Sequence, residues 1–526
     1  GSGQFAAVWL NIPYGGESSI PPIIGGAHIS SDLQHITEYQ VLGVLYGGDP
    51  DFSLTPHIAA GRELFIFQDP ILGTVTAEFG SSVMPFSTES PKLIHHPGED
   101  EYYLFYTSLH YTMDSGDYVD SVLIKADKIG AGGILEKLYE IDTLSYSLIV
   151  EVAVDCCDSA GRFLVVWDEM DEYPNTNIMG QWIDAGGAVG TPFVIDTGGI
   201  MPSVKYDPAG DGFSVVYYKK AQSRYEVETR YVRYGATPGQ AVSLSEALNI
   251  SPGYTSQIAL VYAPGAGPSG QMAAVWYDED NNLYVQYFEP DGSGPAFSEP
   301  YAIEPVNAGA DQHYIVDRIR AVYDESGEVV RVFWRQLDDD IDGPYYLYLR
   351  SITAGYDDGD TLFGTPEYFE EPENSDPSYS PRFETVYDAG EKSVVLYWLQ
   401  ITIDGEIELL KYKVPEMFGQ GGSEPQHLLK RPAGNIDWLY LTAAANAVSG
   451  RSAVVYAIMK EYVTLAYGFY ENIPLSELLR GLDGDPGSIS VADVAIYVRD
   501  HPSLGREAIL DLLHMIDPVH TPLPPQ

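Results

Sequence analysis

Acidic side chains are the residues of this sequence whose spacing could support chemistry. They gather in short loops, each of which follows a hydrophobic stretch that ends in an aromatic residue. Carboxylates that project together repel one another and favour a bound hard cation such as calcium, which needs six or more oxygen ligands. We therefore predict weakly held calcium with four ligands from these loops: Asp278, Asp280, Asp338 and Asp340. The alternative is a solvated acidic face that keeps the protein soluble.

A second acidic segment lies near the C-terminus, where residues 482–493 read LDGDPGSISVAD. Asp483, Asp485 and Asp493 match the first, third and twelfth ligands of an EF-hand-like calcium loop, with one residue deleted and the fifth-position ligand lost. The segment resembles half of a dockerin, and that resemblance implies calcium bound by these three carboxylates. A capped helix behind an acidic turn is the alternative.

The two cysteines of the chain, Cys156 and Cys157, are adjacent and lie in a turn between two hydrophobic stretches. This number excludes a disulfide framework, CxxC metal sites and CxxCH haem attachment. In an oxidising compartment the pair can join as a vicinal disulfide, and two free thiols are the alternative.

No catalytic motif occurs in the sequence. None of the 11 His residues forms HExxH, and no GxSxG follows a predicted strand. A sialidase-like enzyme needs several arginines around one carboxylate, and neighbouring repeats offer five: Arg318, Arg320, Arg335, Arg350 and Arg382. A glycosidase built on two carboxylates would be hidden among the 76 acidic residues. We therefore assign no catalytic residue and no cofactor other than calcium.

Charge limits the partners of the protein. With 28 Lys and Arg against 76 Asp and Glu, the formal net charge is −48. Such a surface repels nucleic-acid phosphates and anionic lipids, so we expect no nucleic-acid partner. No apolar run is long enough to span a bilayer, so we also expect no membrane insertion.

One hydrophobic stretch ending in an aromatic residue recurs along the chain. Clear copies read FLVVW at 163–167 and FSVVY at 213–217, and five of the seven Trp residues occupy the final position of a copy. The other copies end at Trp9, Phe67, Tyr106, Trp276, Trp334, Trp398 and Tyr456. Each better copy belongs to a unit of about four short strands, with turns rich in Gly and Asp. A period of roughly 40–60 residues is typical of a propeller blade.

The sequence therefore predicts an all-β protein with a β-propeller over residues 5–470. We expect eight four-stranded blades if Phe5–Leu10 completes the last sheet, and seven is the alternative because residues 54–86 are few. Apolar residues at helical spacing then predict a small α-helical hairpin within 471–520, and a Pro-rich tail follows at 521–526.

These repeats resemble the divergent propeller repeats of secreted or surface proteins of bacteria and archaea, although they lack the GH…WD and SxDxGxxW signatures. The resemblance implies an extracellular or cell-surface location. Two functions compete. One is a non-catalytic structural or binding protein, either a subunit of a surface assembly or filament or a glycan-binding module, with copies of itself, surface proteins or glycans as partners. The other is a secreted glycan-cleaving enzyme, sialidase-like or another glycoside hydrolase, that uses the central pocket. We favour the first, because the fold hosts both roles and no catalytic site is visible.

Overall fold

We describe the protein from a computed structural model. The described residues are 5–11, 23–29, 40–44, 57–58, 64–69, 73–78, 91–114, 117–129, 135–142, 151–172, 175–184, 186–221, 224–245, 258–264, 270–278, 282–291, 300–303, 315–337, 345–353, 367–369, 381–414, 425–432, 438–446, 448–460 and 463–471. They form strands, turns and short connections. Among them, no helix is long and apolar enough to cross a membrane.

Six sheets have four strands each, taken consecutively from the chain. Their strands are β7 (Lys92–His96), β8 (Glu101–Asp114), β9 (Asp117–Ile129) and β10 (Leu135–Asp142); β11 (Val152–Asp155), β12 (Phe163–Glu172), β13 (Asn175–Asp184) and β14 (Gly187–Thr197); β15 (Gly199–Asp207), β16 (Gly212–Ala221), β17 (Arg224–Val232) and β18 (Val242–Ser243); β19 (Ala259–Ala263), β20 (Gln271–Tyr277), β21 (Leu283–Phe288) and β22 (Tyr301–Ile303); β23 (Ile315–Asp324), β24 (Val329–Leu337), β25 (Tyr345–Thr353) and β26 (Glu367–Phe369); β27 (Arg382–Asp388), β28 (Ser393–Ile401), β29 (Glu406–Lys413) and β30 (Gln426–Pro432).

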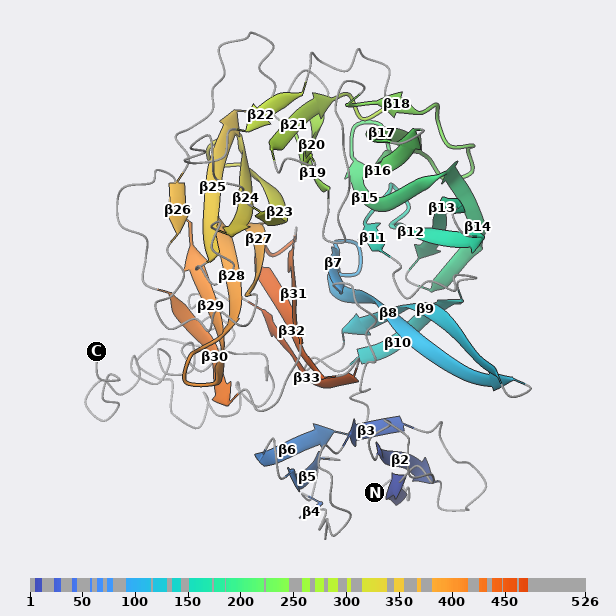
Figure 1. Cartoon of the computed structure of the whole chain (residues 1–526), viewed down its shortest axis with the longest axis vertical. Helices are drawn as coiled ribbons and strands as arrows, with labels where there is room; N and C mark the ends of the chain where they lie inside the picture. The colour runs from blue at the N-terminus through green and yellow to red at the C-terminus, as the bar shows by residue number, and fades with distance from the viewer. Residues whose placement is uncertain are drawn as a thin grey trace.

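Three further sheets have three strands each. One contains β31 (Trp438–Ala445), β32 (Ser452–Lys460) and β33 (Val463–Glu471). The other two are N-terminal: β1 (Phe5–Asn11), β2 (Ile23–Ile29) and β3 (Gln40–Val44), then β4 (His57–Ile58), β5 (Leu64–Asp69) and β6 (Gly73–Glu78). Figure 1 shows these two small sheets below a ring made by the rest.

The ring is defined by the first strand of each sheet. Each of these strands contacts the next one along the chain, in the order β7, β11, β15, β19, β23, β27 and β31. Strand β31 also contacts β7, which closes the ring. Seven hydrophobic clusters fill the junctions between neighbouring sheets, one at each junction. The chain folds as a β-propeller (Figure 1).

The expected numbers of four-stranded blades, eight or seven, are both wrong. The ring has six four-stranded sheets, and the sheet β31–β33 closes it with three strands. Strand β1 pairs with β2, so Phe5–Leu10 does not complete the last sheet. The stretches ending at Trp9 and Phe67 form strands β1 and β5 of the small sheets. A local apolar pattern specifies a strand but does not specify its neighbour. The hairpin and tail predicted within 471–520 and 521–526 lie outside the described residues, apart from Glu471.

In the seven sheets of the ring, the repeated aromatic residue lies on the second strand and is buried. Trp167, Trp276 and Trp334 are at most 1% exposed, because each fills the space between two sheets. Burying a large aromatic side chain at every junction stabilises the ring through the apolar area removed from water.

In five sheets a polar residue is the last residue of the first strand or directly follows it, ten residues before the aromatic one. These residues are His96, Asp207, Asp324, Asp388 and Asn446. Each accepts a hydrogen bond from a backbone N–H two or three residues later, at 2.8–3.0 Å, and so caps the turn to the second strand. Several turns also bind the next sheet: Ser159 donates to Asp211 at 2.6 and 2.7 Å, and Gly390 N donates to Gly450 O at 2.7 Å.

Candidate ligand-binding site on the propeller axis

A cavity of about 220 Å³ lies at the centre of the ring. Its wall takes residues from all seven inner strands, or from the residue just before them. Most of the wall is apolar, and four side chains in it carry a charge: Lys92, Glu151, Arg320 and Glu384. Because strands converge here from sheets far apart in sequence, the fold alone assembles this site.

Arg320 and Glu384 form a bidentate ion pair between β23 and β27. Arg320 Nε donates to Glu384 Oε2 at 2.7 Å, and its Nη2 donates to Oε1 at 2.5 Å. Their side chains are 14% and 13% exposed, so the pair is largely shielded but still reaches the cavity. Two parallel charge-assisted bonds hold both groups in one orientation.

Lys92 and Glu151 form a second, looser pair between the first and second sheets of the ring. Lys92 Nζ lies 3.7 Å from Glu151 Oε1, and the side chains are 26% and 10% exposed. The four charges therefore cancel in pairs. The cavity presents fixed donors and acceptors without a net charge.

Asp168 joins two sheets at the rim of the cavity. One carboxylate oxygen accepts from Glu151 N at 2.8 Å and the other from Met201 N at 3.2 Å, and both of these residues line the cavity. Burial, with a smaller contribution from the charge of Glu151, raises the pKa of Asp168 to about 7 against the opposing effect of the two N–H groups. Met201 has φ +53° and lies where the register between β15 and β16 shifts. Asp168 thus fixes a strained bulge in the cavity wall.

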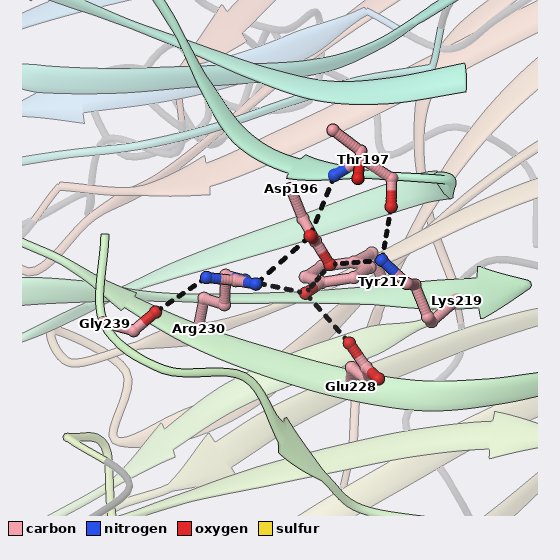
Figure 2. Close-up of polar contacts among 7 residues, drawn as sticks. All are labelled: Asp196, Thr197, Tyr217, Lys219, Glu228, Arg230 and Gly239. Carbon is pink, nitrogen blue, oxygen red and sulfur yellow. Dashed lines mark hydrogen bonds and ion pairs between the residues drawn. The ribbon is translucent and has the colours of Figure 1, made fainter. Parts of the chain in front are cut away.

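Figure 2 shows a polar cluster between the second and third sheets. Asp196 accepts from the Tyr217 hydroxyl at 2.6 Å, from Lys219 at 2.9 Å and from Arg230 at 3.1 Å. Burial alone would raise the pKa of Asp196, but the bonds from Tyr217 and Lys219 outweigh it and hold the pKa below its usual value. Glu228 Oε2 lies 3.2 Å from the same Tyr217 hydroxyl, whose one proton the shorter bond to Asp196 takes, and burial is the main cause that raises the pKa of Glu228.

Tyr217 in this cluster is completely buried, and burial together with its bond to Asp196 raises its pKa strongly. A tyrosine nucleophile would need access and an easily lost proton, and Tyr217 has neither. The cluster is a clamp between two sheets.

Of the arginines considered for a sialidase-like site, only Arg320 lines the cavity. Arg335 is buried and donates to Pro381 O at 2.7 Å, and Arg382 donates to Leu439 O at 2.9 Å. Each of these bonds connects one sheet to the next. The Arg320–Glu384 pair could not be found from sequence, because its members are 64 residues apart on different sheets and share no motif.

Asp278 lies in the turn after β20. Its Oδ1 accepts from Asn282 N at 2.9 Å, and its Oδ2 accepts from Asn282 Nδ2 at 3.1 Å and from Tyr284 OH at 3.0 Å. Both oxygens therefore have protein donors. The other six predicted calcium ligands lie outside the described residues: Asp280, Asp338, Asp340, Asp483, Asp485 and Asp493. Calcium binding remains a prediction.

The structure joins Cys156 to Cys157 as a disulfide in the turn between β11 and β12. A ring nitrogen of His96 and the two sulfurs lie within 4.8 Å of one another. His96 Nδ1 accepts from Glu99 N at 3.0 Å, so Nε2 carries the proton and donates to Gly161 O at 2.7 Å. Both nitrogens are thus engaged in turn contacts, and His96 takes the place that Asp has in other sheets.

No protein-family model and no curated protein sequence matches this chain. Among solved structures, the chain is similar to the BP39L lectin from Burkholderia pseudomallei, with 12% identity, a TM-score of 0.48, and coverage of 74% of this chain and 96% of that one. It is also similar to a leech intramolecular trans-sialidase, with 10% identity, a TM-score of 0.39, and coverage of 90% and 92%. A third similar structure is the Aleuria aurantia lectin, with 11% identity, a TM-score of 0.35, and coverage of 66% of this chain and 97% of that one. Similarity at this level assigns neither a family nor a ligand.

Proposed function

We propose that this protein is a non-catalytic glycan-binding propeller that holds one sugar unit in its axial cavity. The observation that carries the proposal is the pairing of charges in the cavity wall, above all the bidentate Arg320–Glu384 pair. A sugar hydroxyl donates one hydrogen bond and accepts others, so it fits a wall that offers cationic donors beside anionic acceptors.

The size and charge of the cavity support the same ligand class. A volume of about 220 Å³ has room for one small polar ring and is too small for several. The paired charges give no net attraction for an ionised ligand, and the net charge of −48 repels anions. A neutral saccharide satisfies both conditions.

The carboxylates at the cavity favour binding over cleavage. Glu384 is held by Arg320, Glu151 lies beside Lys92, and both oxygens of Asp168 accept backbone N–H groups. A glycosidase needs one protonated and one ionised carboxyl group facing the glycosidic bond. Asp168 has a raised pKa, as the acid of a glycosidase does. The experiment below therefore tests for cleavage as well as for binding.

The test is calorimetric titration of the full chain with methyl glycosides of neutral hexoses, followed by analysis of the same samples for released methanol. We expect binding without release. Glu384→Gln leaves Arg320 without its counter-charge and should weaken binding about tenfold or more. Glu391→Gln breaks the Lys411–Glu391 pair in the same sheet, outside the cavity lining, and should leave binding unchanged.

Release of methanol by the wild-type chain that stops in Asp168→Asn would establish a hydrolase and refute the proposal. Equal affinity of the Glu384→Gln variant and the wild type would remove the cavity as the site.

We further propose that the protein acts outside the cell, alone or as a repeated subunit of a surface assembly. Sedimentation of the purified full chain over a range of concentrations tests assembly. A sedimentation coefficient that rises with concentration is expected for a self-associating subunit. A constant monomer value would contradict self-assembly and leave the protein acting alone.

A further inference from the structure

Among the side chains that the structure describes, Tyr234 is the one exposed Phe, Tyr or Trp, and several contacts restrain it. It is 47% exposed and follows the end of β17. Its backbone lies in a tight turn in which Ala236 N donates to Arg233 O at 3.2 Å. Gly235 in this turn has φ +71°, a conformation that glycine adopts at little cost. The turn therefore fixes where the ring is presented.

Side chains from the neighbouring sheet hold the ring itself. The guanidinium of Arg162 lies 3.4 Å from the centroid of Tyr234, and the Trp182 ring meets Tyr234 edge-on at 5.6 Å. Trp182 is itself buried against Phe213 in the core between the second and third sheets. A cation over the ring and an aromatic edge against it are both attractive contacts.

Arg162 is in turn held by Asp158, whose Oδ2 accepts from Arg162 Nε at 2.7 Å and from Nη2 at 2.6 Å. Asp158 Oδ1 is fixed by the N–H groups of Ala160 and Arg162 at 3.0 and 2.9 Å. No hydrogen-bond partner for Arg162 Nη1 occurs in the described part of the chain. Holding the exposed Tyr234 ring by these two contacts costs side-chain entropy, but a ring that already has its bound orientation loses little entropy on binding.

A carboxylate of the third sheet lies at the same turn: Asp211 accepts from Ser159 N at 2.7 Å and from Ser159 Oγ at 2.6 Å. Asp211 is exposed, and the hydrogen bonds from Ser159 and from Tyr206 OH at 3.1 Å, with a smaller contribution from the charge of Arg162, hold the pKa of Asp211 below its usual value. Asp211 is therefore ionised at neutral pH and accepts hydrogen bonds only. A rigid aromatic face with one donor and one acceptor beside it matches a pyranose, whose ring C–H groups stack while neighbouring hydroxyls donate and accept.

We propose that Tyr234, Arg162 and Asp211 form a second sugar site, at the junction of the second and third sheets, for a neutral pyranose of a glycan chain. The proposal shares its ligand class with the proposed function but rests on none of the cavity contacts. A neutral sugar fits better than an acidic one, because Asp158 and Asp211 offset the charge of Arg162 and the chain as a whole is strongly negative.

The test is binding of the full chain to an array of immobilised neutral and sialylated oligosaccharides. Tyr234→Ala should lower the affinity for neutral oligosaccharides about tenfold at this site, whereas Tyr234→Phe, which keeps the ring, should stay within about twofold of the wild type. Ile403→Ala is the matched control, since Ile403 is another exposed apolar side chain, 65% exposed, in a turn. It should leave binding unchanged, and melting temperatures of all variants establish that they are folded.

The site is refuted if Tyr234→Ala binds the neutral oligosaccharides as the wild type does, and its ligand class is refuted if the wild type prefers the sialylated ones. Glu384→Gln separates this proposal from the axial one. If Tyr234→Ala alone loses binding, the site at Tyr234 is supported and the axial site is refuted. If Glu384→Gln alone loses binding, the axial site is supported and the site at Tyr234 is refuted.

Discussion

Two junctions of the ring are held together by different means. Between the second and third sheets, the buried Asp196 binds Tyr217, Lys219 and Arg230 across the gap (Figure 2). Between the last and first sheets, the contact is a cluster of apolar side chains, with tyrosines from one side against small alanines from the other. Directional hydrogen bonds between charged and polar groups hold the first junction, and close packing of apolar side chains holds the second.

The sequence separation explains the difference. The closing junction joins segments about 350 residues apart, and two hydrogen bonds that cross it run from Leu93 N to Thr442 Oγ1 at 2.9 Å and from Asn446 Nδ2 to Asp100 Oδ1 at 3.0 Å. Apolar packing is non-directional and is gained as soon as the surfaces meet. A charge cluster is stable only when every partner is in place, so it suits a junction between consecutive sheets that form together.

The largest effect is expected at the closing junction. Leu104 is completely buried in its cluster, and Leu104→Ala should lower the free energy of unfolding by about 3 kcal/mol through lost apolar burial and the cavity left behind. Urea unfolding measures this. Val448→Ala, at an exposed position, should change stability by less than about 0.5 kcal/mol. A loss below about 1 kcal/mol in Leu104→Ala would show that this packing does not hold the ring closed.

A somewhat smaller effect is expected at the charged junction. Asp196→Asn leaves Lys219 and Arg230 without their counter-charge and should cost about 2 kcal/mol, less than for a fully buried pair because these two are 24% and 23% exposed. The cost should fall as salt is added, whereas that of Leu104→Ala should not. Glu101→Gln removes a partly exposed pair with Lys128, whose side chains are 33% and 31% exposed, and should cost less than about 1 kcal/mol. Equal salt dependence of both junctions would contradict the comparison.

Asp168 links the second and third sheets and makes that junction sensitive to pH. Its pKa is raised in the folded protein to about 7 from an ordinary 3.8, so between these values the folded state binds more protons than the unfolded state. Its contribution to the free energy of unfolding is therefore full below about pH 4 and is lost as pH rises to 7, by up to about 1.4 kcal/mol per pH unit. Asp168→Asn should reduce this slope. Unfolding curves at pH 5, 6 and 7 compare the two, and parallel profiles would exclude the titration of Asp168.

The buried hydroxyl of Thr442 at the closing junction gives a finer test. Thr442→Val deprives Leu93 N of its acceptor and should cost about 1.5 kcal/mol, since a buried N–H is left unpaired. Thr442→Ser keeps the hydroxyl and should retain most of that stability. If Val and Ser variants are equally stable, the hydrogen bond does not contribute to closure.

The smallest effect is expected from the cysteines, which lie in a turn beside the junction of the first and second sheets. A link between adjacent residues closes almost no loop, so reducing Cys156–Cys157 should change the free energy of unfolding by about 1 kcal/mol or less. Alkylation without reductant followed by mass measurement shows whether the link exists in the purified protein. Two alkylated thiols would refute it.

The aromatic residue of each repeat could be located from sequence because it combines an apolar run with one large side chain, and in the ring Trp167, Trp276 and Trp334 fill three different junctions. The blade count could not be obtained in the same way. The run ending at Trp9 has the same local pattern, yet β1 pairs with β2 and joins no ring sheet. Pairing depends on neighbours that the local sequence does not identify.

The candidate sites were less accessible to sequence reasoning. Arg320 and Glu384 are ordinary charged residues until β23 and β27 meet at the axis. Tyr234 is one of 40 tyrosines, and only its stacking with Arg162 of the preceding sheet distinguishes it. The residues that cap the turns could be found from sequence, because each lies ten residues before the repeated aromatic residue. Asn446 and His96 have the same interval as the aspartates.

Every ring sheet is made from consecutive strands, and in the described chain no sheet borrows a strand from another. In a propeller that closes by a shared strand, a gained or lost blade must preserve the two ends that meet. Here one uninterrupted stretch of coding sequence specifies each whole ring sheet. Closure of the ring requires only that the sheet β31–β33 packs against the sheet β7–β10. Duplication or deletion of a single gene segment can therefore change the size of the ring, so relatives of this protein should differ by whole blades more readily than by parts of them.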